Sequence, residues 1–254
     1  MSFNETPNKG YLDILRHERR NLLDLLRKTR FTTLKTGYSQ SQVIPHASYS
    51  PWLDDEAFNT TYAAVKSHTL VDIYRCYELH TLARQAAAHP GDLVEIGVWR
   101  GGTAALIGCA APTKTLHLFD TFEGVAKADQ RYDTLYKGGE HADTDQEMVQ
   151  ALLQTLSLHA EIHPGIFPED SLAYLPPQIA MAHIDVDTYQ SAYESFHAIW
   201  PRVQTGGVIV FDDYGFFGCE GVTQAVDELR NSVKGAAFVH NLNGHGIIFR
   251  VHRS

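Results

Sequence analysis

Two pairs of aspartates follow apolar runs in the second half of the chain. Asp185 and Asp187 follow the run that begins at Ile179, and Asp212 and Asp213 follow the run 207–211. Such runs are typical of strands buried on both faces of a parallel sheet, and open α/β sheets bind ligands at the carboxyl ends of their strands. Four carboxylates gathered there repel each other unless a cation joins them or some are protonated. The two pairs together predict a metal site, although each pair taken alone is compatible with an acidic loop start.

A glycine-rich turn earlier in the chain, Gly97–Gly102 with Gly101 inside it, follows an expected strand and opens an expected helix. Asp120 stands 23 positions after Gly97. This layout is typical of a nucleotide-binding βαβ unit, in which glycines let the backbone approach the ligand and the acid accepts ribose hydroxyls. Trp99 stands where a dinucleotide fingerprint requires glycine, and Glu95 would repel a pyrophosphate but accept an ammonium group. A ligand with a ribose and an ammonium group but no phosphate is S-adenosylmethionine; the alternative is a packing turn.

Composition limits the class of protein. The 254 residues, 44% of them hydrophobic, fit one α/β domain plus an extension. A net charge of −9 gives no basic field for nucleic acid or an anionic membrane. The three cysteines have no metal-ligand spacing, which favours buried thiols in a reducing compartment. No signal peptide or membrane-spanning run is recognised, so we expect a cytoplasmic protein.

Strand and helix patterns alternate along the chain and predict a three-layer, Rossmann-like α/β fold. A hairpin around Asn243-Gly244 adds an antiparallel pair at the end. The 121–143 connection is too long for an ordinary βα loop, so we interpret it as either disordered or functional. We expect strands at 92–96, 115–119, 160–164, 179–182, 207–211, 237–241 and 246–251, and helices at 11–30, 67–89 with Ser67 as N-cap, 103–111, 144–157, 188–199 and 220–233.

The first 60 residues form a separate extension in this interpretation, and 61–254 form the α/β domain. Residues 11–30 have the apolar spacing of an amphipathic helix with a basic face. Such a helix either binds a membrane or packs on protein, and we favour packing, with homo-oligomerisation through the extension. The polar stretch 32–55 contains Tyr38, Tyr49 and Trp52, which either form a lid over an acceptor or fix the loop in place.

Four motifs in this order resemble the macrocin O-methyltransferase family, and the similarity runs from about Leu70 to the C-terminus. The motifs are Leu93–Gly102, Phe119–Gly124, His183–Tyr189 and Val210–Tyr214. Members of that family methylate sugar hydroxyls of macrolide, aminocoumarin and related glycosylated natural products. The resemblance implies a class I methyltransferase fold, with a seven-stranded, mostly parallel sheet whose last pair is reversed, in agreement with the expected hairpin.

The resemblance also implies roles for particular residues. It implies a general base at Asp187, and the 121–143 connection adds His141 as a second candidate because that loop could close over the site. Carboxylate-only ligation agrees with a hard ion such as Mg²⁺. His183 lies deeper in its strand, where a hydrogen-bonded core histidine is more common than a ligand. The implied Mg²⁺ ligands are Asp185, Asp212 and Asp213, and the implied cofactor contacts are Glu95, Gly97 and Asp120, with an adenine loop around Phe167, Asp170 and Ser171.

The sequence thus predicts an S-adenosylmethionine- and Mg²⁺-dependent O-methyltransferase. Its acceptor would be the sugar hydroxyl of a small glycosylated natural product in antibiotic-type biosynthesis. A catechol-like phenol is the nearest alternative acceptor, since it also offers two vicinal oxygens. A metal-dependent hydrolase using the same aspartates and a nucleoside-binding regulatory protein are the alternatives from other classes. The first 60 residues match no quoted motif, so they do not identify the acceptor.

Overall fold

The structure is a computed structural model that describes residues 9–28, 43–45 and 49–252. It divides into two compact units, Met1–Ser50 and Pro51–Ser254. The expected boundary at residue 60 falls inside a helix of the second unit, α3 (Glu56–Val65). That helix packs on α5 (Gly102–Ala110), so the α/β unit begins before residue 61. Tyr38 of the expected lid lies outside the described residues.

The first unit contains α1 (Lys9–Leu26), which ends earlier than the expected helix 11–30. Arg27 follows it and bonds Oδ1 of Asp24 at 3.0 Å and the carbonyl oxygen of Ile44 at 3.1 Å. Several apolar side chains of α1 are exposed, and the expected self-association through this extension stays a prediction. No helix among the described residues is long and apolar enough to cross a bilayer. The exposed apolar residues of α1 are Ile14, Leu15, Leu22, Leu25 and Leu26.

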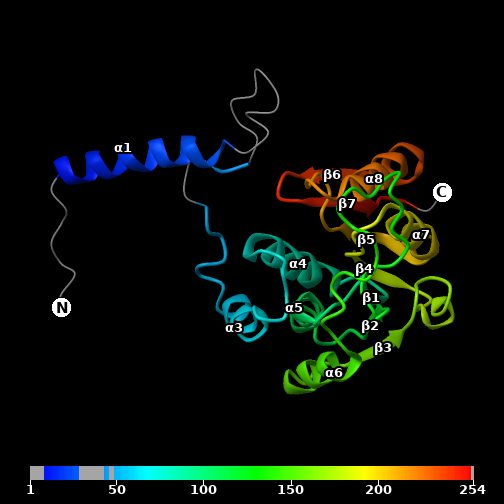
Figure 1. Cartoon of the computed structure of the whole chain (residues 1–254). Helices are drawn as coiled ribbons and strands as arrows, with labels where there is room; N and C mark the ends of the chain where they lie inside the picture. The colour runs from blue at the N-terminus through cyan, green and yellow to red at the C-terminus, as the bar shows by residue number, and fades with distance from the viewer. Residues whose placement is uncertain (1–8, 29–42, 46–48, 253–254) are drawn as a thin grey trace. The chain divides into compact units, whose positions relative to one another are not determined.

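The second unit is built on one seven-stranded sheet with the strand order β3-β2-β1-β4-β5-β7-β6 (Figure 1). The first five strands are parallel, and β7 runs antiparallel to both β5 and β6. This arrangement confirms the expected class I methyltransferase fold with a reversed last pair. The strands are β1 (Asp92–Ile96), β2 (Leu116–Asp120), β3 (Ala160–Pro164), β4 (Ile179–Ile184), β5 (Val203–Phe211), β6 (Ala236–Asn241) and β7 (His245–Arg250).

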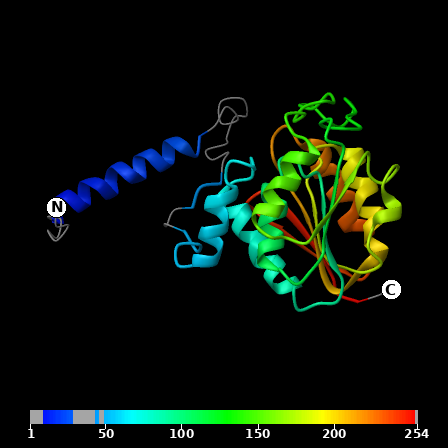
Figure 2. The same ribbon diagram turned by 90° about the horizontal axis from the view of Figure 1, so that it is seen from below.

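Helices cover both faces of this sheet, as Figure 2 shows. One core includes Phe58 of α3, Leu79 of α4 (Ile73–Ala86), Leu106 of α5 and Leu153 of α6 (Gln146–Thr155). The core on the opposite face packs residues of α7 (Tyr189–Ile199) and α8 (Glu220–Ser232) against the strands. Burial on both faces explains why β4 reads as an uninterrupted apolar run. Short 3₁₀ turns at Leu172–Tyr174 and Trp200–Arg202 complete the unit.

The structure corrects the sequence prediction between residues 56 and 89. Residue 67 lies in a turn, and α4 begins at Ile73 instead. The N-cap is Asp72, whose carboxylate accepts the backbone N–H of Arg75 at 3.0 Å. A separate helix, α3, precedes the turn, and only Phe58 and Val65 of its residues are fully buried. Two buried residues make a weak periodic pattern, which explains why the sequence did not reveal α3.

Candidate active site

A cavity of about 380 Å³ opens at the carboxyl edge of the parallel strands. Its wall contains the turn at Gly97–Trp99, Asp120 at the end of β2, and Phe167 after β3. The 121–143 loop contributes Tyr136 and His141, so it is a structured part of the cavity wall and not a disordered segment. The four aspartates of the two pairs all line this cavity. The structure therefore brings together both halves of the predicted site.

The aspartates meet because β4 and β5 are adjacent and in register. Ile184 pairs with Phe211, so Asp185 and Asp212 leave the sheet side by side. The N–H of Asp212 still donates to the carbonyl oxygen of Ile184 at 2.9 Å. Asp187 and Asp213 have φ values of 63° and 59°, the left-handed region that non-glycine residues seldom adopt. The chain turns at both positions, so consecutive acidic side chains can reach the same cavity.

Arg75 is the cation that faces this acidic edge. Its Nη1 lies 2.5 Å from Oδ1 of Asp212 and 3.0 Å from Oδ1 of Asp213, and its Nε bonds Asp72 at 2.9 Å. Burial opposes its charge, but Asp212, Asp72 and Asp213 raise the pKa of Arg75 above its ordinary value. Its ring neighbour is Phe216, whose centroid lies 4.7 Å from the guanidinium carbon. Sequence reasoning missed Arg75 because a lone arginine on a helix carries no pattern.

One guanidinium does not neutralise four carboxylates. Burial, followed by the charges of Asp212, Asp213 and Asp187, raises the pKa of Asp185 well above its ordinary value. Burial and Asp213 also raise the pKa of Asp187 to about 7, against a hydrogen bond with Tyr136 that lowers it. A bound cation would lower both pKa values, because it favours the ionised carboxylates.

His245 links Asp212 to Glu78. Nδ1 of His245 lies 2.6 Å from Oε2 of Glu78, and its Nε2 lies 3.2 Å from Oδ1 of Asp212. Burial opposes protonation of His245, but Asp212 and Glu78 outweigh it and raise the pKa to about 9. The sequence predicted the hairpin turn at Asn243-Gly244 but gave no sign that the next residue points at the acidic edge.

The predicted metal ligands lie at one edge but do not form a single compact group. Among the described residues, ligand atoms of His183, Asp212 and His245 lie within 4.8 Å of one another. Those of Asp187, Asp213 and Cys219 form a second such group, and Asp185 belongs to neither. The guanidinium of Arg75 already bonds the Oδ1 atoms of Asp212 and Asp213.

Glu95 does not line the cavity. Its side chain is fully buried, and Oε1 lies 2.7 Å from Nδ1 of His183, which is also fully buried. Burial raises the pKa of Glu95, and the contact with His183 lowers it. The expected direct contact with a cofactor ammonium group is therefore corrected to a position that supports β4. His183 is confirmed as a core residue, although its Nε2 has no hydrogen-bond partner among the described residues.

Only part of the glycine turn forms the cavity wall. Gly97 has a φ of 83°, and a Cβ there would lie 1.7 Å from the carbonyl oxygen of Asp185, so only glycine fits. Gly101 is instead the N-cap of α5, packed against Val149 and outside the cavity wall. Oδ2 of Asp120 accepts the backbone N–H groups of Val98 and Trp99 at 2.5 and 2.9 Å. Asp120 thus fixes the turn as well as facing the cavity.

The long loop is tied to this turn. The indole Nε1 of Trp99 donates to Oδ1 of Asp143 at 2.8 Å, and Nη2 of Arg100 donates to Oδ2 at 2.5 Å. His141, two residues before Asp143, has its ring centroid 6.4 Å from that of Trp99. Earlier in the same loop, the buried side chain of Asp133 accepts the backbone N–H of Tyr189 at 2.9 Å. These contacts hold the loop across the carboxyl edge of the sheet.

Of the three residues named for the expected adenine loop, only Phe167 lines the cavity wall, next to Ile166. Phe167 lines the cavity, and its ring centroid lies 4.9 Å from that of Phe119. Asp170 instead accepts the backbone N–H of Ile166 at 2.8 Å, and this closes the turn. Ser171 is buried outside the wall, with no hydrogen-bond partner for its hydroxyl among the described residues. Asp170 and Ser171 therefore shape this loop from outside the cavity.

Comparison with known proteins identifies similar O-methyltransferases. Residues 59–251 match the model of the macrocin O-methyltransferase family. The demethyldecarbamoylnovobiocin O-methyltransferase of Streptomyces niveus is 29% identical over 181 residues, which cover 65% of this chain and 68% of that protein. The 8-demethyl-8-(2,3-dimethoxy-alpha-L-rhamnosyl)-tetracenomycin-C 4'-O-methyltransferase of Streptomyces olivaceus is 28% identical over 201 residues, which cover 72% of this chain and 76% of that protein. The solved O-methyltransferase NovP has 25% identity and a TM-score of 0.64, covering 73% of this chain and 83% of that one.

The fold is that of the class I methyltransferases, and the chain is an S-adenosylmethionine-dependent methyltransferase. Because the family model matches residues 59–251, the chain belongs to the macrocin O-methyltransferase family. The resemblance inferred from the four motifs is thereby confirmed.

Proposed function

We propose that this enzyme transfers the methyl group of S-adenosylmethionine to a sugar hydroxyl of a glycosylated natural product, with Mg²⁺ as a second cofactor. The observation that carries the proposal is the convergence of Asp185, Asp187, Asp212 and Asp213 with the Gly97 turn on one cavity. The names of the two Streptomyces relatives, which describe O-methylation of novobiocin- and tetracenomycin-type compounds, support an antibiotic-type acceptor. One of those names specifies a rhamnosyl group.

The cofactor half of the cavity would hold S-adenosylmethionine without any pyrophosphate cradle. Asp120 faces the cavity and can accept ribose hydroxyls with its remaining lone pairs. Phe167 offers an apolar face to the adenine, and Gly97 allows the ligand to approach the backbone closely. Since Glu95 lies outside the wall, the ammonium group would face the acidic edge instead, where the aspartates provide negative charge.

Asp185, Asp212 and Asp213 would hold the Mg²⁺ ion. Their donor set consists only of carboxylate oxygens, which a hard divalent cation prefers. The raised pKa of Asp185 supports the binding of a cation at this edge, because a cation would favour the ionised carboxylate. Arg75 bonds one carboxylate oxygen of Asp212 and one of Asp213. The ion would therefore bind their second oxygens, or the guanidinium would move away to free the first. When bound, Mg²⁺ supplies a Lewis acid that lowers the pKa of the acceptor hydroxyl.

Asp187 would accept the proton of that hydroxyl. It lines the cavity beside the proposed ligands, and Tyr136 hydrogen-bonds its carboxylate and so fixes its orientation. The acceptor oxygen then forms a bond to the methyl carbon as the sulfur–carbon bond breaks, and S-adenosylhomocysteine leaves. Holding the acceptor oxygen in line with the sulfur–carbon bond accelerates the transfer. A well-placed base accelerates it further, by roughly 10²- to 10⁴-fold. His141 lines the same cavity and is the second candidate for the base.

The acceptor would enter past exposed apolar side chains at the cavity wall. Leu135, Phe216 and Phe217 all line the cavity, and their exposed fractions are 58%, 37% and 58%. Aromatic faces suit the apolar face of a sugar ring or an aromatic aglycone. This arrangement favours an acceptor larger than a free monosaccharide.

A direct assay tests the proposal. Purified enzyme with S-adenosylmethionine and Mg²⁺ is offered a rhamnosylated natural product and, separately, a catechol. We expect mass spectrometry to detect one added methyl group on the sugar and an equal amount of S-adenosylhomocysteine. Methylation of the catechol alone would overturn the acceptor class. Conversion of either compound without S-adenosylmethionine would instead indicate the hydrolase alternative.

A further inference from the structure

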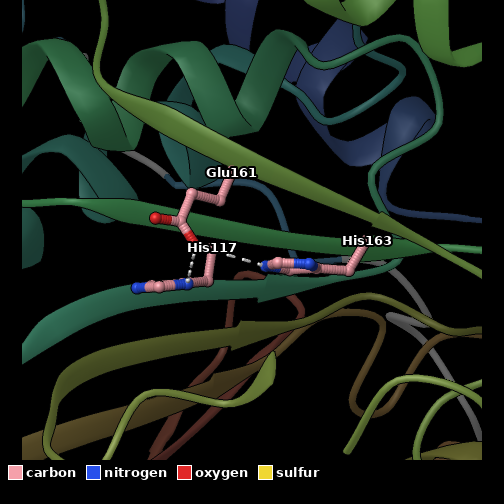
Figure 3. Close-up of side chains that lie close together, drawn as sticks. All are labelled: His117, Glu161 and His163. Atoms are coloured by element: carbon pink, nitrogen blue, oxygen red, sulfur yellow. Dashed lines mark ion pairs between the residues drawn. The ribbon is translucent and has the colours of Figure 1, made fainter. Parts of the chain in front are cut away.

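Two histidines and a glutamate lie together on β2 and β3, outside the cavity just described. His117 and Glu161 are register partners on the two strands, and His163 is the partner of Phe119. Residues two apart along a strand face the same side, so all three side chains project from one face of the sheet (Figure 3). None of them lines the methyltransferase cavity.

The three side chains present a compact set of ligand atoms. Nδ1 of His117 lies 3.6 Å from Oε2 of Glu161, and Nε2 of His163 lies 3.8 Å from the same oxygen. The three ligand atoms lie within 4.8 Å of one another. Zinc bonds of about 2.0–2.1 Å in a tetrahedron place ligand atoms about 3.3 Å apart. Small side-chain adjustments would therefore bring these atoms onto one ion.

The histidine nitrogens that face Glu161 lie too far from its carboxylate for a hydrogen bond. Neither Nδ1 of His117 nor Nε2 of His163 has a hydrogen-bond partner among the described residues. Both side chains are about nine-tenths buried, with exposed fractions of 9% and 10%, so water reaches these nitrogens poorly. A buried polar atom without a partner is destabilising, which indicates that a ligand belongs there.

The other contacts of His117 determine what that ligand must be. Its Nε2 lies 3.3 Å from Oδ2 of Asp92, so the tautomer that donates to Asp92 leaves a lone pair on Nδ1. That lone pair faces the carboxylate of Glu161, and two acceptors facing each other repel unless a cation lies between them.

We propose that His117, Glu161 and His163 bind a transition-metal ion of the zinc class, with Asp92 orienting His117. Imidazole nitrogens favour zinc over Mg²⁺, and a carboxylate behind a ligating histidine is the usual supporting contact in zinc sites. Glu161 is 54% exposed, so the ion has a path from solvent and room for a water as fourth ligand. This site is independent of the Mg²⁺ proposed at the aspartates.

The ion would fasten the outer strand of the sheet beside the expected adenine loop. β3 is an edge strand, bonded on one side only to β2. The ring of His163 packs 4.9 Å from Phe119, which in turn packs 4.9 Å from Phe167 in the cavity wall. Binding to the folded state alone stabilises that state, so zinc should raise the melting temperature of the protein in a concentration-dependent way.

A zinc titration of the full chain tests the proposal. Chelator-treated protein is titrated with Zn²⁺ against a chromophoric competitor, in millimolar Mg²⁺ to occupy the aspartates. We expect the wild type to bind one zinc per chain. Glu161→Gln should raise the Kd for zinc at least 10-fold and His163→Gln at least 100-fold, whereas His159→Gln should leave that Kd unchanged. His159 is a suitable control because it is an exposed histidine just before β3. Glu161→Gln alters an exposed carboxylate, so it remains informative if His163→Gln does not fold.

Nitrogen chemical shifts of the histidine rings give a second readout. With zinc bound, we expect His117 to ligate through Nδ1 while its Nε2 stays protonated toward Asp92. At the same zinc concentration, zinc should also raise the melting temperature of the wild type more than that of Glu161→Gln. The proposal is overturned if the wild type binds no zinc under these conditions. It is equally overturned if Glu161→Gln and a folded His163→Gln both bind zinc with wild-type affinity.

Discussion

Nη1 of Arg75 lies 2.5 Å from Oδ1 of Asp212, so a helix outside the sheet neutralises part of the acidic edge that β4 and β5 create. The two residues are 137 positions apart in the chain. Their contact places a protein cation where the proposed function also requires a metal cation. The balance between these two cations can be measured.

Replacing Arg75 should destabilise the enzyme most when no Mg²⁺ is present. Arg75→Gln leaves buried carboxylates without their partner, and removing one member of a buried ion pair costs about 3–5 kcal/mol of unfolding free energy. Added Mg²⁺ should recover more stability in this variant than in the wild type. Denaturant unfolding with and without Mg²⁺ measures both effects, and Arg84→Gln, at an exposed ion pair with Asp55, is the control. An equal Mg²⁺ increment in Arg75→Gln and wild type would show that the two cations do not share this edge.

Replacing Asp120 should weaken S-adenosylmethionine binding. Asp120→Asn loses charge-assisted acceptance of the Val98 and Trp99 amides and of the ribose hydroxyls, so we expect a loss of about 1–3 kcal/mol in binding free energy. Calorimetry with S-adenosylmethionine provides the measurement. Glu123→Gln, an exposed neighbour in the same loop, should bind like the wild type. Unchanged affinity in Asp120→Asn would mean that the turn has only a packing role.

Replacing Asp133 should loosen the long loop. Asp133→Ala leaves the partly buried backbone N–H groups of Asp129 and Tyr189 without their acceptor, at a cost of about 1–3 kcal/mol. We expect limited proteolysis to cut within the 121–143 loop faster in this variant. S-adenosylmethionine should protect the loop in the wild type, because the loop forms part of the cavity wall. The control is Arg131→Gln, at a highly exposed position of the same loop. If Asp133→Ala is cleaved no faster than this control, Asp133 does not hold the loop in place.

Sequence reasoning could locate the aspartates because their position depends on a regular rule. Buried parallel strands end at one edge, so Asp185 and Asp212 had to emerge there, and the structure places them side by side. The hairpin at Gly244 was equally readable, because the turn needs a positive φ, which is 105° in the structure. Local chemistry and strand topology fixed both features.

Other features depend on contacts that no local pattern encodes. Arg75 and His245 reach the acidic edge from α4 and β7, so only the folded sheet shows them near Asp212. The same holds for Glu95, whose position in the motif suggested a cofactor contact. Its side chain instead turns toward His183 on the neighbouring strand β4, because strand alternation decides which face it occupies.

The role of Asp187 can be separated from that of its neighbours. If Asp185, Asp212 and Asp213 hold the ion, Asp185→Asn should weaken Mg²⁺ binding, and high Mg²⁺ should partly restore its activity. Asp187→Asn should instead lower kcat by roughly 10²-fold or more with little change in Mg²⁺ or S-adenosylmethionine affinity. Steady-state kinetics over a Mg²⁺ series distinguishes the two. Rescue of Asp187→Asn by Mg²⁺ would make it a ligand and move the base role to another group, with His141 tested first.

Metal dependence of methyl transfer tests the central claim most directly. The initial rate of transfer from labelled S-adenosylmethionine to a glycosylated acceptor is measured in excess chelator and again after Mg²⁺ is restored. We expect the chelator to abolish transfer and Mg²⁺ to restore it, because the acceptor hydroxyl then regains the cation that lowers its pKa. Zinc alone, which should fill the His117 site, should not restore the rate. Full activity in excess chelator, with no metal retained by the protein, would contradict the account of the aspartate edge.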